Sequence, residues 1–263
     1  MPEPSGLKGL LPKFKADVLL VFANNKNTPA DCAKGIAEAI HGWAVKGLPK
    51  VQHTGVPPKG LAGGQAVVGY VTTAPGVVSG DGLGGIDMDA PGIGLSAAKP
   101  KLYADFLTNF GNNKNTPDQI ADEFTQAVYD FLVSAQVKTT LTGTVPPGVA
   151  VVTGPTGVGP GTYTGSGVGG IDKSAPGLGL LAAKAVLVAD LTVAYGNTAN
   201  TPATLSQSLS EAVFKFLSAA KIETKDKGTA GGGPAVLSES GAGATSAPGS
   251  PIISGTAISG TIA

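Results

Sequence analysis

The feature that most constrains this sequence is an internal repeat. The tripeptide Asn-Thr-Pro begins at positions 27, 115 and 200, which are 88 and 85 residues apart. The aspartates Asp17, Asp105 and Asp190, each preceded by Ala, keep the same offsets. The tetrapeptide Gly-Gly-Ile-Asp at 84–87 returns at 169–172. Independent matches in one register indicate three copies of one supersecondary unit, the third with a divergent end.

Each copy divides into a helix-forming half and a half rich in Gly and Pro. The repeat offsets place the boundaries of the three copies and of their halves. Repeat 1 spans 1–98, with a helical hairpin over 8–47 and an arm over 50–98; repeat 2 spans 99–183, with a hairpin over 99–135 and an arm over 137–183; repeat 3 spans 184–263, with a hairpin over 184–220 and a divergent Gly/Ser/Thr-rich arm over 222–263.

Helical periodicity identifies the hairpins. In repeat 2, Leu102, Phe106 and Phe110 follow at four-residue spacing, which is typical of one helix face. The second helix of each hairpin carries a row of apolar residues that we expect to be a shared packing stripe. The stripe consists of Cys32, Ile36, Ile40 and Trp43 in repeat 1, Ile120, Phe124, Val128 and Phe131 in repeat 2, and Leu205, Leu209, Val213 and Phe216 in repeat 3.

A Thr-Pro pair starts this second helix in every copy. Threonine is a favoured N-cap residue, and proline fits the first helical position because its missing N–H has no partner there. The predicted caps are Thr28 with Pro29, Thr116 with Pro117, and Thr201 with Pro202.

The second half of each copy lacks helix formers. Residues 137–145 and 149–153 are β-branched and predict short strands, which repeat 1 mirrors at 54–58 and 66–73. The Gly-rich stretches 80–94 and 154–179 show no sustained period, and we expect them to be extended arms. We hypothesise that neighbouring subunits order these arms through strand addition to sheet edges.

These patterns predict an α+β fold of three tandem helical-hairpin repeats with short β-strands and long Gly/Pro-rich extended arms. The shared stripe favours packing of the hairpins into a six-helix cluster. Three separate units, each docking on a partner, are the alternative.

Composition excludes several function classes. All 18 basic residues are Lys, and 18 acidic residues balance them, which argues against a nucleic-acid reader whose affinity needs a basic face. Charged residues make up 14% of the chain, and such low charge density opposes self-association only weakly. The single cysteine forms no internal disulfide. Signal-peptide features and a stretch of ~20 apolar residues are absent, so we expect synthesis in the cytoplasm and no membrane partner.

Candidate reactive residues are few. His41 and His53 have no second His or Cys at metal-ligand spacing. The cluster Asp81, Asp87 and Asp89 lacks the closing Glu of a calcium loop. No Gly-x-Ser-x-Gly elbow lies between a strand and a helix. We therefore expect no enzyme, no catalytic residue, no cofactor and no metal.

The unit resembles small virion structural proteins of tailed bacteriophages. Each copy joins an amphipathic helix to a Val/Thr strand and a Gly/Thr-rich tail, with Thr142-Gly143 and Pro146-Pro147 inside and Ser-Gly-Thr-Ile-Ala over 259–263. This chain departs from that pattern by fusing three units. The resemblance implies a component of the capsid, neck or tail without catalysis.

The sequence therefore predicts a structural protein localised in a virion and made in the host cytoplasm. Its role is capsid cement, minor capsid protein, or neck or tail accessory, bridging neighbouring subunits through its arms. The expected partners are coat or tail proteins and further copies of itself. A subunit of a self-assembling bacterial filament or surface layer is the alternative, and a carbohydrate-binding repeat protein is a weaker one.

Overall fold

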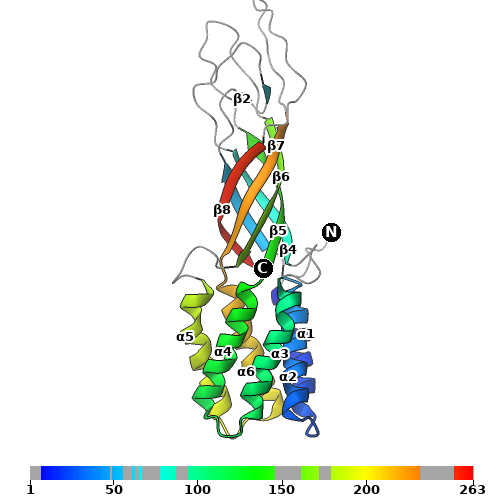
Figure 1. The fold of residues 1–263 in the computed structure, drawn as a ribbon, viewed down its shortest axis with the longest axis vertical. Helices are drawn as coiled ribbons and strands as arrows, with labels where there is room; N and C mark the ends of the chain where they lie inside the picture. Colours follow the sequence, from blue (N-terminus) through cyan, green and yellow to red (C-terminus); the bar gives the residue numbers. More distant parts are fainter. Residues whose placement is uncertain are drawn as a thin grey trace, which may run out of the picture.

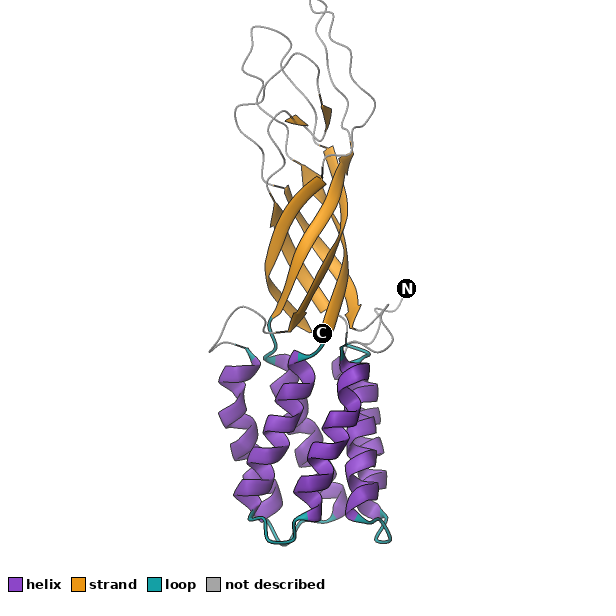
Figure 2. Ribbon diagram, viewed as in Figure 1, coloured by secondary structure: helices purple, strands orange, loops and turns teal. Residues whose placement is uncertain are grey.

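Six helices form one end of the molecule and a bundle of long strands forms the other (Figures 1 and 2). This computed structural model describes residues 7–47, 49–55, 61–62, 65–66, 78–86, 94–145, 161–171, 179–231 and 252–262. The helices, each of 16 or 17 residues, are α1 (Leu7–Ala23), α2 (Pro29–Ala44), α3 (Leu95–Gly111), α4 (Pro117–Val133), α5 (Leu180–Gly196) and α6 (Pro202–Ser218).

The helices form a closed ring. They pair as the hairpins α1–α2, α3–α4 and α5–α6, and each helix contacts the next one along the chain, while α6 returns to contact α1. The hairpin turns lie at the end of the ring that is farthest from the strands (Figure 1). The predicted helical hairpins are thus present, and they pack on one another rather than standing as separate units.

Two glycines start helices of this ring. Gly94 precedes α3 with a φ of 72°, and Gly179, the same position of the next repeat, precedes α5 with a φ of 64°. Side chains with a Cβ rarely adopt this left-handed region. The two glycines therefore let the chain turn sharply into each hairpin.

Six antiparallel strands close into a barrel at the other end of the molecule. The strands are β1 (Pro49–Gly55), β4 (Val78–Ile86), β5 (Gln136–Val145), β6 (Gly161–Ile171), β7 (Ile222–Gly231) and β8 (Ile252–Ile262). They are hydrogen-bonded in that order, and β8 pairs with β1. A separate small sheet joins β2 (Leu61–Ala62) to β3 (Gln65–Ala66).

On β4 and β6, every second residue over much of the strand is a glycine that lies on the inner face of the barrel. Val137 is buried and Thr140 exposed on β5, so the face that carries Val137 points inward. The strand register puts three glycines of β4 and three of β6 on that same face. They are Gly80, Gly82 and Gly84, and Gly165, Gly167 and Gly169. At these positions β4 and β6 place no side chain on the inner face.

The barrel corrects the prediction of extended arms. β4 includes residues 80–86 of the first stretch, β6 lies in the second, and β7 and β8 lie in the arm over 222–263. These strands pair within one chain. The prediction was wrong because glycine, and not an apolar residue, occupies every second position over much of β4 and β6. A strand is ordinarily recognised by alternating apolar residues.

Other predicted strands have mixed outcomes. The strand expected over 137–145 is present as β5, and β1 includes residues 54 and 55 of the segment expected over 54–58. The strand predicted over 149–153 lies outside the described residues. In the segment 66–73 only residue 66 is described, at the end of β3. Within the described part of the chain, none of the helices is long and apolar enough to cross a membrane.

Candidate functional site

The predicted packing stripe faces the interior of the helical ring. Nine of its twelve residues are buried: Ile36, Ile40, Trp43, Phe124, Val128, Phe131, Leu209, Val213 and Phe216. The first residue of each row, Cys32, Ile120 or Leu205, is partly exposed. Burial, and secondarily the charge of Asp31, raises the pKa of the Cys32 thiol. The stripe thus reaches the surface at the turn end of the ring, where each row begins.

The Thr-Pro pairs build the same cap at all three turns. The hydroxyl oxygens of Thr28, Thr116 and Thr201 accept hydrogen bonds from the backbone N–H three residues later, and each proline occupies the first helical turn. In return, the backbone N–H of each threonine donates a hydrogen bond to the side chain of that third residue, which is Asp31, Gln119 or Thr204. Hydrogen bonds from Thr28 lower the pKa of the Asp31 carboxyl, which plays this role in repeat 1.

An asparagine pair holds each turn in shape. The amide of Asn24 donates to the side chain of Asn27 at 2.7 Å, and Asn27 in turn donates to the carbonyl of Val21 at 2.8 Å. The same two bonds recur with Asn112 and Asn115 in repeat 2 and with Asn197 and Asn200 in repeat 3. Sequence reasoning missed this role, although the signal Asn-x-x-Asn-Thr-Pro is present in all three copies.

A cavity of about 410 Å³ opens among these turns, and residues of all three hairpins line it. Hairpin α1–α2 contributes Phe22 and Cys32, hairpin α3–α4 contributes Phe110 and Ile120, and α5 contributes Tyr195. Phe22, Phe110 and Tyr195 occupy the same position of the three repeats. We call this space the turn-end cavity.

Two residues that line the turn-end cavity each carry a buried polar atom with no hydrogen-bond partner among the described residues. The two atoms are the side-chain oxygen Oδ1 of Asn109 and the hydroxyl of Tyr195. Asn109 is only 2% exposed, and its amide nitrogen donates to the carbonyl of Ile120 at 2.9 Å. Burial raises the pKa of the Tyr195 hydroxyl, which keeps it protonated. Both atoms are shielded from solvent, so neither is exposed to the cavity.

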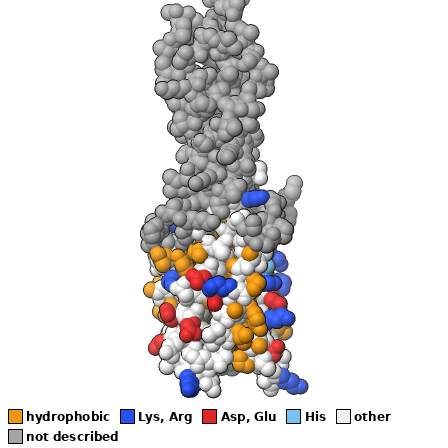
Figure 3. Space-filling model, in the orientation of Figure 1, with side chains coloured by type: hydrophobic (Ala, Val, Ile, Leu, Met, Phe, Trp, Pro, Cys, Tyr) orange, Lys and Arg blue, Asp and Glu red, His pale blue; other side chains and the backbone are white. Residues whose placement is uncertain are grey.

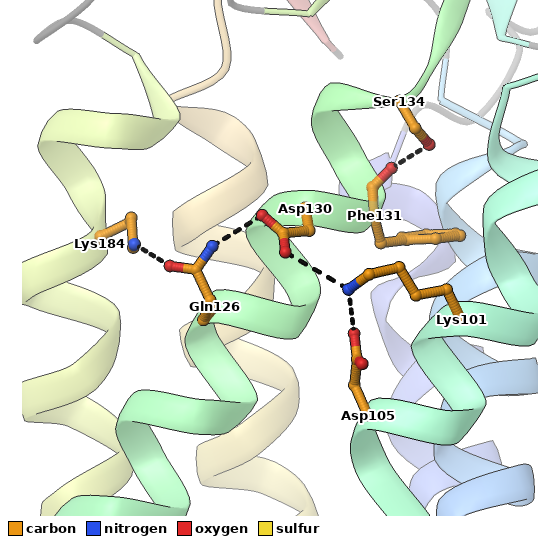
Figure 4. A network of polar contacts seen from close by, with 7 residues as sticks. All are labelled: Lys101, Asp105, Gln126, Asp130, Phe131, Ser134 and Lys184. Atoms are coloured by element: carbon orange, nitrogen blue, oxygen red, sulfur yellow. Dashed lines mark hydrogen bonds and ion pairs between the residues drawn. The ribbon is translucent and has the colours of Figure 1, made fainter.

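A chain of polar contacts joins two hairpins on the outer surface of the ring (Figure 4). The Lys101 ammonium on α3 lies 2.6 Å from Asp105 and 3.4 Å from Asp130 on α4. Asp130 accepts from the Gln126 amide at 2.7 Å, and Gln126 accepts from Lys184 on α5. The bonds to Asp105 raise the pKa of the Lys101 ammonium. The exposed charges stabilise this seam only weakly.

Of the histidines and aspartates weighed in the sequence, the described ones, His41, His53 and Asp81, do not line the turn-end cavity. The His41 ring nitrogen Nε2 is 3.4 Å from the Ser96 hydroxyl, on the outer surface between α2 and α3. His53 belongs to β1 and Asp81 to β4, while Asp87 and Asp89 fall outside the described residues. Among the residues that the structure describes, no group of three or more His, Cys, Asp or Glu side chains is placed to hold a metal ion.

Comparison with known proteins gives no relative. No protein-family model matches the chain, and no curated protein or solved structure matches it significantly.

Proposed function

We propose that this chain is a structural protein of a virus particle, a capsid cement, minor capsid, neck or tail component. The observation that carries the proposal is the joint closure of two rings, one of helices and one of strands, by three tandem copies. Hairpins that share one sequence pattern around one axis present repeated contacts to a larger assembly. Tandem linkage raises the effective concentration of each later contact.

The outer surface of the helical ring supports contact with other proteins. Leu20 on α1 is 72% exposed, and Val193, at the same position of α5, is 73% exposed. Leu181 and Val186 add further exposed apolar surface on α5. Figure 3 shows hydrophobic side chains gathered on the helical end of the molecule. Apolar surface of this kind often marks protein interaction sites.

The contact surface in this proposal differs from the one expected from sequence. The arms were expected to bridge neighbouring subunits, but the strands β4, β6, β7 and β8 already use their hydrogen-bonding edges within the barrel. We therefore assign the bridging contacts to the outer faces of α1 and α5.

The test is sedimentation of the tagged full-length chain from its source cells. We expect it to travel with intact particles in a density gradient, and to remain a monomer when it is purified alone. The double variant Leu20→Glu with Val193→Glu should remove most of the chain from the particle fraction, because it places charges on the apolar contact. Thr108→Glu, at the same position of α3, replaces no apolar contact and should leave occupancy unchanged.

Three results would overturn this proposal. The first is a chain found solely in fractions that contain no particles. The second is polymerisation of the purified chain into fibres or sheets, which the filament alternative predicts. The third is full particle occupancy by the double variant.

A further inference from the structure

The outer face of α5 differs from the outer faces of its counterparts in the other repeats, α1 and α3. Residues spaced by four, three and four positions point away from the ring on each of these helices, and we call them the outer row. At its second position, repeats 1 and 2 carry Lys13 and Lys101. Of the three outer rows, that of α5 alone has no charged or hydrogen-bonding side chain. It consists of Ala182, Val186, Ala189 and Val193, all exposed.

The two charged residues of α5 are turned toward the neighbouring helices instead. Lys184 donates to the Gln126 side chain on α4 (Figure 4), and Asp190 accepts from Lys215 on α6 at 3.1 Å. Leu181, which is 40% exposed, adds apolar surface beside the outer row. A helix that is apolar on its outer side as well as on its core side is ordinarily covered by another element. The outer row of α5 therefore has the character of a helix contact.

The order of side chains along the outer row of α5 matches a second copy of itself. Spacings of four, three and four residues are those at which two helices of a coiled coil meet along their length. Small and larger side chains alternate along it as Ala, Val, Ala, Val. When two such rows run antiparallel, Ala182 lies opposite the partner's Val193, and Val186 lies opposite the partner's Ala189. Every layer then joins one small and one larger side chain, whereas parallel rows would leave a gap at each pair of alanines.

From this self-complementary row we propose that two copies of the chain pair antiparallel through α5, about a two-fold axis that passes beside residues 187 and 188. A two-fold contact is isologous, so the layer that Ala182 forms at one end is repeated by Val193 at the other. The barrel and the ring follow one another along the helix direction (Figure 1). The two barrels of the pair therefore extend from opposite ends.

The small size of this contact sets its strength. Between residues 182 and 193 the outer row is about 17 Å long, and a helix is about 10 Å wide. Such a contact buries less than the ~1,200 Å² of a stable complex. We expect a dissociation constant of about 0.1–1 mM, so that a purified sample at micromolar concentration is monomeric and pairing occurs where copies are concentrated.

Pairing through α5 goes beyond the proposed function, because it requires no particle. On a particle it would assign α5 to contacts between copies of this chain and leave α1 to contact the coat or tail protein.

Sedimentation equilibrium of the full chain, from about 10 μM to about 1 mM, measures the pairing without any particle. Val186→Lys installs the residue that repeats 1 and 2 carry, four residues before Asp190. Lys101 bonds to Asp105 at the same spacing, so the new lysine has a partner within α5. Because pairing would bury its charge, this variant should pair about tenfold more weakly or worse. Leu20→Glu, on the outer face of α1, is the control and should leave the dissociation constant unchanged.

Cysteine cross-linking tests the direction of the pair. In a chain with Cys32→Ala, which removes the native thiol, single variants Ala182→Cys and Val193→Cys are prepared and mixed in a glutathione redox buffer. We expect disulfide-linked pairs that contain one chain of each kind. Linked pairs formed by Val193→Cys alone would indicate parallel rows and would overturn the antiparallel assignment.

The proposal is overturned if the unaltered chain sediments as a monomer over the whole concentration range, or if Val186→Lys pairs as tightly as the unaltered chain. Should Val186→Lys fold poorly by circular dichroism, Val193→Glu decides the question, since Val193 is 73% exposed and tolerates a polar side chain. Either result leaves the proposed function standing, because particle occupancy is measured separately.

Discussion

The helical ring and the barrel are closed by the same three repeats but with opposite kinds of residue. The ring buries large side chains such as Phe106, Phe124 and Phe216. The barrel instead places glycines on the inner face of β4 and β6, the two strands that flank β5. Side-chain packing therefore stabilises the ring, whereas backbone hydrogen bonds and close strand approach define the barrel. We therefore expect the ring to be most sensitive to loss of side-chain volume and the barrel to be sensitive to added volume.

Removing volume from the ring should give the largest effect. Phe124 is fully buried and stacks on Phe106 with ring centroids 4.6 Å apart. We expect Phe124→Ala to lower the free energy of unfolding by about 3–5 kcal/mol, because it leaves a cavity in the packed interior. Urea denaturation followed by far-UV circular dichroism measures the loss. Leu20→Ala, on the exposed face, should change stability by less than about 0.5 kcal/mol.

Adding volume to the barrel should give the next largest effect. Gly165 lies on the inner face and pairs with Leu141, while its neighbour Ser166 lies on the outer face opposite Thr140. We expect Gly165→Val to cost about 1–3 kcal/mol through overpacking, although valine favours strands. Ser166→Val is the matched control, and equal stability of the two variants in thermal melts would contradict the inner-face assignment.

Two glycines of α2 should respond differently to substitution by alanine, because their surroundings differ. A Cβ on Gly35 of α2 would lie 2.5 Å from Val21 Cγ2, but a Cβ on Gly42 of the same helix would meet nothing within 4 Å. Valine is stiff in a helix and yields little. Gly35→Ala should therefore cost about 1–2 kcal/mol after its gain in helix propensity, and Gly42→Ala should stabilise by up to about 1 kcal/mol. Paired denaturation curves compare them, and stabilisation by both would show that α1 and α2 can separate.

Lowering the pH should give the smallest effect, and we expect it to be confined to the helix cap of repeat 1. The pKa of Asp31 is lowered in the folded chain from its ordinary value of 3.8, so its contribution is present above that value and is lost as the pH falls through the folded pKa. Gln119 and Thr204 hold the same cap position in the other hairpins and do not titrate. Hydrogen exchange of capping-box amides should therefore accelerate at Thr28 as the pH falls below 4, relative to Thr116 and Thr201. Equal changes at all three caps would contradict this.

The sequence was sufficient for the hairpins but not for the barrel. The spacing of Phe106 and Phe110 and the Thr-Pro caps are local signals, and they predicted the helices closely. The strand β6 has few apolar residues, and its alternating glycines carry no hydrophobic pattern. Its pairing with β7 and the pairing of β8 with β1 join segments distant in the chain, which no local pattern reports.

Local sequence patterns did not predict the turn-end cavity either. The predicted packing stripe covers only the second helix of each hairpin, so it does not include Asn109 on α3 or Tyr195 on α5. Both residues could have been found by aligning the three copies and looking for a polar residue where the other two copies carry an apolar one. That they meet on one cavity required the ring to be closed in three dimensions, because they come from different hairpins.

The pairing of β8 with β1 has a consequence for synthesis on the ribosome. Roughly 200 residues separate the end of β1 from the start of β8, and α1 likewise awaits α6. At about 5–20 residues per second, translation leaves one edge of β1 without its final partner for about 10–40 s. An open strand edge invites pairing with other nascent chains. The contacts within each hairpin are local, so during synthesis the strands are more open than the helices to pairing with other chains.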